Sequence, residues 1–231
     1  MENRKDAPIR QRILQAAGEI FGCRGFKAAT VREICRRADA NVAAVNYYFG
    51  GKEALYREVV RDLIAGTFAK FSVETANPEA SAQERLAVFV RATLSRLLSP
   101  GGLSGYRGRG QLVARELAEP SPILDTMVED FIAPTAAVLG GIVSDLLGPA
   151  AEPELVMRCQ VSVIGQCFHY AMARPVLTRL GLVDYARPEI VAEIADHITR
   201  FSLEAMVGLR RRIESEKGRG AGRKRNRRNQ Q

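Results

Sequence analysis

The stretch ATVREICRRADANVAAVNYYFGGKEALY, residues 29–56, predicts three short helical pieces separated by two breaks. The first break is Asp39-Ala40-Asn41, and the second is Gly50-Gly51-Lys52. The piece between them is only about eight residues long and carries two adjacent tyrosines near its end. So short a helix so close to the N-terminus requires an explanation other than core packing.

The ends of these helices can be read from residues that stabilise helix termini. Thr30 followed three residues later by Glu33 is a capping box that starts one helix, and Asn41 is a suitable N-cap for the next. Two short helices joined by a turn of three or four residues match the helix-turn-helix plan. A recognition helix is short because only its first turns enter a major groove about 12 Å wide. The pattern also occurs in proteins that do not bind DNA, so the surrounding residues must indicate whether this helix-turn-helix binds it.

The exposed face of the short helix is expected to meet DNA. Asn46 can pair bidentately with adenine, and Val42 or Ala43 can touch a thymine methyl group. The hydroxyl of Tyr47 can reach a phosphate, and Tyr48 either does so or packs beneath the helix. Arg32 is either a DNA contact or a solvated charge. The full set of predicted DNA-binding residues is Arg32, Asn41, Val42, Ala43, Ala44, Asn46, Tyr47, Tyr48 and Lys52, the last at a helix start that favours phosphate.

Apolar residues recur at three- and four-residue spacing along nearly the whole chain, and alternating β-branched runs are missing. The fold class is therefore predicted as all-α, with a three-helix head, a larger helical body and a basic, disordered C-terminal tail. The predicted domains are a DNA-binding head over 1–56, a ligand-binding and dimerisation body over 57–215, and the tail over 216–231. Helices are expected from Ile9 to a stop at Gly25, from Thr30, from Asn41, from Lys52 to about Thr75, and over about 80–98, 109–118, 122–147, 153–172 and 188–214.

Charge is concentrated at the two ends of the chain. The net charge of the 231 residues is +8. The first 60 residues hold eleven Lys or Arg against seven Asp or Glu, and residues 217–231 hold seven basic residues and no acid. This asymmetry indicates an anionic polymer or surface as partner. The tail either adds non-specific DNA affinity or solubilises the chain.

The remaining composition favours a reduced, cytoplasmic protein. The four cysteines form no C-x-x-C pair and no signal peptide is present, so buried free thiols are expected. No apolar run approaches the roughly 18 residues of a membrane span, so no membrane is predicted as partner. Two histidines are too few for a metal cage with these cysteines, and neither a metal nor a cofactor is expected.

Residues 10–56 resemble the DNA-binding domain of TetR-family transcriptional repressors. The resemblance rests on Gly25-Phe26, Thr30, Ile34 and the ending Phe49-x-x-Lys52-x-x-Leu55. Asp39 replaces the turn glycine of that family, and Asn46 replaces its first tyrosine. With ARELAEPSP at 114–122 and VIGQCFHYAMARPVL at 163–177, the chain looks like the CecR (YbiH) subgroup. The resemblance implies negative regulation, an inverted-repeat operator in double-stranded DNA, a small and hydrophobic drug-like inducer, and a homodimer.

In such proteins the body holds the inducer pocket and the dimer interface. The segment 153–172 is apolar nearly all round, which fits burial either against a second subunit or in the centre of the body. A two-fold interface of 153–172 and 188–212 is favoured, with predicted contacts at Val161, Gly165, Phe168, Ile194 and Phe201. Candidate ligand residues, each with core packing, an interface or an internal ion pair as the alternative, are Phe89, Arg115, Glu116, Met127, Phe131, Gln166 and His169.

Two rival functions remain at this point. One is a small helical enzyme in the body with the head as a DNA tether, although no nucleophile–base pair or carboxylate constellation has usable spacing. Alternatively, the protein binds DNA constitutively and senses nothing. Ligand-dependent release of DNA distinguishes a sensor from a constitutive binder, and turnover of a ligand would indicate an enzyme.

Overall fold

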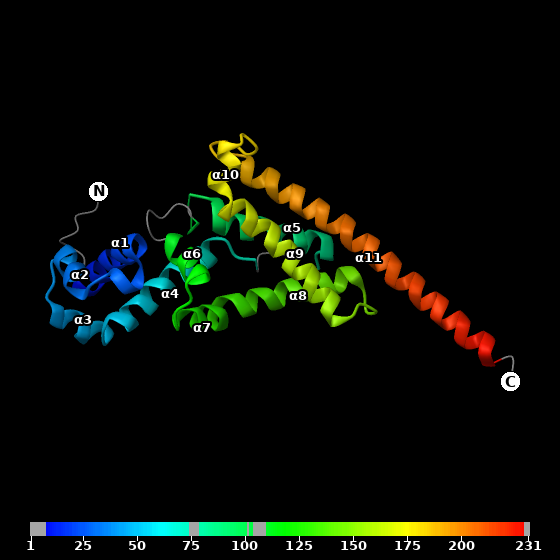
Figure 1. Ribbon diagram of the computed structural model, residues 1–231, viewed down its shortest axis with the longest axis horizontal. Helices are drawn as coiled ribbons and strands as arrows, with labels where there is room; N and C mark the ends of the chain where they lie inside the picture. Colours follow the sequence, from blue (N-terminus) through cyan, green and yellow to red (C-terminus); the bar gives the residue numbers. More distant parts are fainter. Residues whose placement is uncertain (1–7, 74–78, 101, 104–109, 229–231) are drawn as a thin grey trace. The chain divides into compact units, whose positions relative to one another are not determined.

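The computed structural model describes residues 8–73, 79–100, 102–103 and 110–228, with side chains left undescribed at 110, 111 and 218–228. Within these ranges the secondary structure is helical and no strand occurs, which confirms the all-α prediction (Figure 1). The chain divides into two compact units. The first unit is Met1–Phe71 with Arg96–Ala133, and the second is Ser72–Ser95 with Pro134–Gln231.

The head is built by α1 (Ile9–Ala28), α2 (Val31–Ala38), α3 (Val42–Phe49) and the start of α4 (Lys52–Lys70). Its core contains Ile13, Phe21, Ile34, Val45 and Leu55, all fully buried, so the inward faces read from periodicity are those that pack. The predicted stop at Gly25 appears as a break near the end of α1, where φ is 74°. Because that conformation is strained for residues with a Cβ, glycine is required there.

The first unit continues beyond the head. It contains α6 (Gly110–Ala118), α7 (Ile123–Met127) and a single π-helical turn, η2 (Val128–Ile132). Ile123 and Met127 are buried in the same core cluster as the head, with Phe131 packed against it. The boundary predicted at residue 56 therefore lies inside this unit.

The second unit contains most of α5 (Ala82–Leu98), α8 (Ala133–Leu147), α9 (Pro153–Met172), α10 (Arg174–Arg179) and α11 (Ile190–Arg228). Its helices are joined by surface ion pairs, including Arg85–Asp145 at 2.6 Å and Arg91–Asp196 at 2.9 Å. Such exposed pairs contribute at most about 1 kcal/mol each, so apolar packing supplies most of its stability.

The end of α11 departs from the sequence prediction. The helix continues to Arg228, so residues 216–228 are helical where disorder was expected, and that part of the prediction is wrong. Lys and Arg have good intrinsic helix propensity, and extending an existing helix avoids the cost of nucleation. The positions of the basic side chains beyond Lys217 lie outside the described residues.

One described helical stretch, Ile123–Leu147, is long and apolar enough to cross a membrane by length and composition alone, with a mean hydropathy of 1.5 over an 18-residue window. The expectation that no segment reaches this measure is therefore wrong. A single such helix is weak evidence of a membrane span, because core helices of soluble proteins have the same composition. Here Leu139, Ile142 and Val143 are buried within the protein.

Candidate nucleic-acid interface

Side-chain caps fix where the two short helices begin. The hydroxyl of Thr30 accepts a hydrogen bond from the Glu33 amide at 3.3 Å, and Asn41 Oδ1 accepts one from the Ala44 amide at 2.8 Å. Both caps satisfy amides that a helix start leaves without partners. They confirm the starts of α2 and α3 that the sequence predicted. The side chain of Asn41 therefore caps α3, and it is also exposed at the start of that helix.

The turns on either side of α3 use unusual backbone conformations. Asp39 ends α2 with a φ of 50°, and Arg12 donates to its carbonyl at 3.1 Å. Asp tolerates this left-handed region better than most residues, which explains how it replaces a turn glycine. After α3, Gly50 and Gly51 have φ values of 78° and 133°. A side chain at either position would be strained, so the second break needs both glycines.

The outer face of α3 presents a mixed set of side chains to solvent. Val45 and Phe49 are buried, whereas Val42, Ala43, Asn46, Tyr47 and Tyr48 are exposed and Ala44 is partly so. Tyr47 is 83 % exposed, and its ring stands edge-on to that of Tyr48 at 5.0 Å. An amide, two phenols and small apolar groups on one short helix are the groups that meet base edges, phosphates and thymine methyls.

Arg32 and Lys52, the two cationic residues predicted to contact DNA, differ in their surroundings. Arg32 is exposed on α2 and has no ion-pair partner among the described residues. Lys52 is half-buried at the start of α4, where its ammonium lies 4.6 Å from the Phe26 ring centroid and 3.4 Å from the Lys27 carbonyl oxygen. Lys52 therefore joins the start of α4 to the end of α1. This structural role was not read from the sequence.

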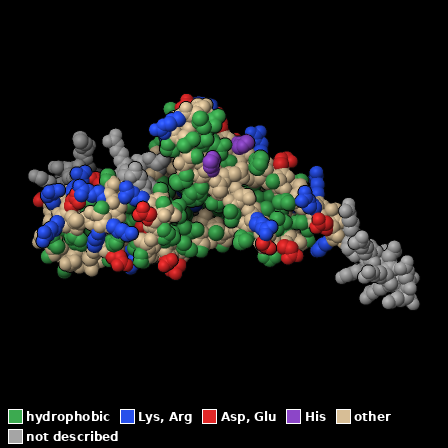
Figure 2. Space-filling view, viewed as in Figure 1, with side chains coloured by type: hydrophobic (Ala, Val, Ile, Leu, Met, Phe, Trp, Pro, Cys, Tyr) green, Lys and Arg blue, Asp and Glu red, His purple; other side chains and the backbone are tan. Residues whose placement is uncertain are grey.

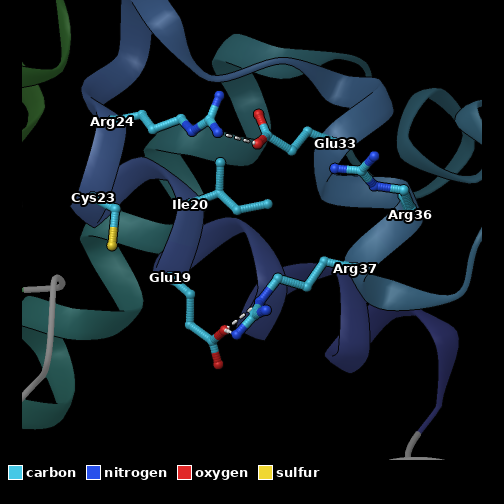
Figure 3. Close-up of a pocket in the computed structure, with 7 residues that line it drawn as sticks. All are labelled: Glu19, Ile20, Cys23, Arg24, Glu33, Arg36 and Arg37. Carbon is cyan, nitrogen blue, oxygen red and sulfur yellow. Dashed lines mark hydrogen bonds and ion pairs between the residues drawn. The ribbon is translucent and has the colours of Figure 1, made fainter.

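A pocket of about 450 Å³ lies between α1 and α2. Figure 3 shows Arg24 paired with Glu33 on one side of Ile20, and Arg37 paired with Glu19 on the other. No residue of α3 lines it. The ion pairs connect α2 to α1 and so support the angle at which the helix-turn-helix is held.

In the view of Figure 2, Lys and Arg side chains gather over the head.

Arg115 and Glu116 connect helix α6 to the head. Both were predicted to line a ligand cavity or to form an ion-pair network. The Tyr56 hydroxyl donates to Glu116 Oε1 at 2.6 Å, and Glu116 Oε2 accepts from the Ser121 amide and hydroxyl. Arg115 donates to the Cys23 carbonyl at 3.2 Å. Glu116 is 3 % exposed, and burial together with this bond raises the pKa of Tyr56. Arg115 and Glu116 thus hold α6 against α1 and α4.

The other candidate ligand residues are spread over both units. Met127 and Phe131 belong to the first unit, where Phe131 lies edge-on to Phe68 at 5.5 Å. Phe89, Gln166 and His169 belong to the second. Phe89 is fully buried and His169 is exposed, while Gln166 Nε2 donates to Ser202 Oγ at 3.4 Å, joining α9 to α11.

Helices α9 and α11 leave apolar side chains in solvent. Met157 and Val161 on α9 are 54 % and 66 % exposed, Phe201 on α11 is 61 % exposed, and Gly165 between them is also exposed. Phe168 is half-buried. Ile194, the fifth predicted interface residue, is instead 5 % exposed and buried within the chain. We call Met157, Val161, Gly165 and Phe201 the apolar face of α9 and α11.

Comparison with protein families gives two separate matches. Residues 13–59 match the family described as bacterial regulatory proteins of the tetR family, and residues 82–206 match the C-terminal domain of the HTH-type transcriptional dual regulator CecR. The second match spans more than half of the chain. The two matched regions include every predicted DNA-binding and interface residue.

Individual relatives agree with these matches. The HTH-type transcriptional repressor NicS of Pseudomonas putida is 27 % identical over 87 % of this chain and 92 % of its own length. The dual regulator CecR of Shigella flexneri is 25 % identical over 77 % and 82 %. A match to the probable regulator YttP of Bacillus subtilis, 34 % identical, covers only 37 % of this chain and 42 % of that protein.

Solved structures support the fold. FadR of Bacillus subtilis, solved with stearoyl-CoA, superposes with a TM-score of 0.58 at 16 % identity, covering 86 % of this chain and 98 % of that one. A TetR-like regulator of Rhodococcus sp. RHA1 gives a TM-score of 0.58 at 16 % identity, covering 87 % and 96 %. The family matches and the full-length relatives NicS and CecR are transcriptional regulators and not enzymes, which removes the helical-enzyme alternative. The chain belongs to the TetR family of bacterial transcriptional regulators and carries a CecR-type C-terminal domain.

Proposed function

We propose that the protein is a cytoplasmic, homodimeric repressor that binds an inverted-repeat operator and leaves it when a small, largely apolar effector binds. The observation that carries this proposal is the exposed face of α3, where Asn46, Tyr47 and Tyr48 stand clear of a closed core. The Tyr48 ring also lies 6.5 Å from that of Phe49, but Tyr47 is 83 % exposed and Asn46 is exposed as well, so core packing does not account for this face. The exposed groups match the chemistry of a major groove, with Asn46 reading adenine and the phenols contacting phosphate.

The apolar face of α9 and α11 supports a dimer. Large apolar side chains that remain more than half exposed lose favourable burial, and each regains about 1.5–3 kcal/mol when covered. Two copies of the same face would bury themselves around a two-fold axis. Gly165 suits this arrangement, because nothing lies within 4 Å of where its Cβ would be, which leaves room for a second backbone. A two-fold dimer in turn requires an operator with two inverted half-sites.

The contacts of α6 suggest how an effector acts on the head. Tyr56 sits in the first turns of α4, and Glu116 ties it to α6 through a buried hydrogen bond. An effector that favours a different position of α6 would act on the head through this bond and through Arg115. A ligand shifts such an equilibrium only to the extent that it binds one state better than the other. A modest change in head spacing suffices, since two half-sites lie about 34–36 Å apart.

Operator binding with and without an effector tests the proposal. Genomic fragments retained by the purified protein would supply the operator, and a ligand screen against that complex would supply the effector. The proposal expects a defined inverted repeat whose affinity falls at least about tenfold with an active ligand, as for an allosteric coupling of 1–3 kcal/mol. Specific binding that no ligand weakens would indicate a constitutive DNA-binding protein instead.

A further inference from the structure

A buried arginine in the first unit has no acidic partner among the residues that the structure describes. Arg96, near the end of α5, is 6 % exposed. Its Nε donates to the Phe71 carbonyl at 2.9 Å, and its guanidinium carbon lies 3.8 Å from the centroid of the Phe68 ring. Among the described residues no carboxylate forms an ion pair with it. Buried arginines are nearly always paired, because removing an unpaired charge from water costs several kcal/mol.

Two acids of the same unit, Glu116 and Asp130, are engaged by other residues. Glu116 is bound by Tyr56 and Ser121, and Asp130 pairs with Arg61 at 3.3 Å. Burial lowers the pKa of Arg96 to about 10, so the side chain still carries its charge at neutral pH. The Phe71 carbonyl and the Phe68 ring compensate this charge only in part, because neither carries a full negative charge. A guanidinium also has five N–H donors, of which the Phe71 carbonyl uses one.

The surroundings of Arg96 are aromatic and apolar. Phe68 contacts Arg96 on one side and lies edge-on to Phe131 at 5.5 Å on the other. Phe131 lies in the π-helical turn η2, and Met127 is buried one turn before it. π-Helical turns occur often at functional sites. A cation backed by aromatic rings and an apolar wall is suited to a molecule with an apolar body and an anionic end.

We infer that Arg96 is the anion-binding residue of the effector site, and that the effector carries a carboxylate or phosphate group on an apolar or aromatic body lying against Phe68 and Phe131. This inference rests on the proposed sensor function and gives the chemical class of its ligand. It adds a charge requirement to an effector otherwise described only as small and apolar. All residues that carry it belong to the first unit.

The test uses three matched probes, 4-phenylbutanoate, 4-phenylbutyl phosphate and the neutral 4-phenylbutanamide, with the full-length protein. Calorimetry would measure their dissociation constants, and fluorescence anisotropy would measure release of the selected operator. The unmodified protein is expected to bind at least one anionic probe about 10- to 100-fold more tightly than the amide, as for gain of a charge-assisted hydrogen bond. Whichever anion binds more tightly shows whether a carboxylate or a phosphate is preferred.

Three variants separate anion recognition from a structural role. Arg96→Gln should lose the preference for the anionic probe, and Arg96→Lys should retain most of it because the charge remains. Arg91→Gln makes the same substitution on the same helix, at an exposed residue paired with Asp196, and should bind like the parent. If Arg96→Gln is too unstable to purify, equal binding of the anions and the amide by the parent would still overturn the inference.

The inference is overturned if no anionic probe binds, if the anions and the amide bind alike, or if Arg96→Gln keeps the preference. Failure of the sensor proposal would look different: an anionic probe binds through Arg96 but leaves operator affinity unchanged. Conversely, a neutral compound that releases DNA equally from the parent and from Arg96→Gln supports the sensor and removes the anion site.

Discussion

Two surfaces of this protein leave apolar side chains in water, and they differ in what accompanies those side chains. On α3, Val42 and the rings of Tyr47 and Tyr48 stand beside the amide of Asn46, so each apolar group has a hydrogen-bonding neighbour. On α9 and α11 the large exposed apolar side chains include Met157, Val161 and Phe201, which carry no hydrogen-bonding group of their own, although Ser162 and His197 are exposed beside them. A polar, wet groove such as that of DNA suits the first surface, whereas a second protein surface suits the second.

The largest effect is expected from placing a charge on the apolar face. In Gly165→Arg the new Cβ meets nothing within 4 Å in its own chain and the position is exposed, so folding should be preserved. Across a dimer interface it would bury an unpaired charge in each subunit, at about 3–5 kcal/mol per charge. We expect monomers by light scattering, and the same for Val161→Asp.

The matched control for that change is Gly141→Arg on α8, another exposed helical glycine with nothing within 4 Å of its Cβ position. It should leave the dimer intact. A dimer that persists in both Gly165→Arg and Val161→Asp would remove the apolar face as the interface and, with it, the contrast with α3.

A smaller effect is expected on the other surface, from Asn46→Ala. Loss of a bidentate contact to a base should cost about 1–3 kcal/mol on the preferred site and relax the preference at one base position. The caps of α3 come from Asn41 and not from Asn46, so the helix should persist. Binding to specific and random DNA of equal length is the measurement, and an equal loss on both would show that Asn46 reads no base.

Arg32 and Lys52 sharpen the description of the DNA surface further. Arg32→Ala should weaken binding to all sequences alike and reduce the slope of log affinity against log salt by about one per subunit, since one phosphate contact is lost. Lys52→Ala should reduce the slope by less and lower the thermal midpoint, because the Lys52 ammonium also contacts Phe26 and the Lys27 carbonyl. Salt titrations of both variants decide which cation contacts phosphate.

An effect on stability rather than on DNA binding is expected inside the first unit, from Tyr56→Phe. The change removes a hydrogen bond to a buried carboxylate and should lower the free energy of unfolding by about 1–3 kcal/mol. The pKa of Tyr56 is raised in the folded protein from an ordinary value of 10.0, so its contribution is complete below pH 10 and is lost as pH rises further. Denaturant unfolding should therefore show a difference between parent and variant at neutral pH that shrinks above pH 10. A constant difference would contradict the bond as the source.

Local signals made the head predictable from sequence. Thr30 and Asn41 are caps at the positions expected, and Val45 and Phe49 are buried as the helical period requires. Long-range contacts were not predictable in this way. The bond between Tyr56 and Glu116 joins residues 60 positions apart, and the short helix α10, with Pro175 in its first turn, lies where no helix was predicted.

Arg96 was missed although a signal for it exists. Leu86, Phe89, Thr93 and Arg96 recur at three- and four-residue spacing, so the arginine falls on the buried stripe of α5. A cation on such a stripe is unusual enough to be noticed from sequence. Whether Arg96 pairs with an acid cannot be read from the sequence, because only the tertiary structure shows which acids lie near it.

The central claim is that two copies of α3 read two equivalent half-sites, and base-resolved selection of bound DNA by the parent and by Asn46→Ala tests it most directly. The account predicts an inverted repeat for the parent, with half-sites about one helical turn apart or a multiple of that spacing. It further predicts that Asn46→Ala loses preference at one position in each half-site, symmetrically about the centre. A parent that selects no repeat, or a variant whose loss falls outside both half-sites, would contradict it.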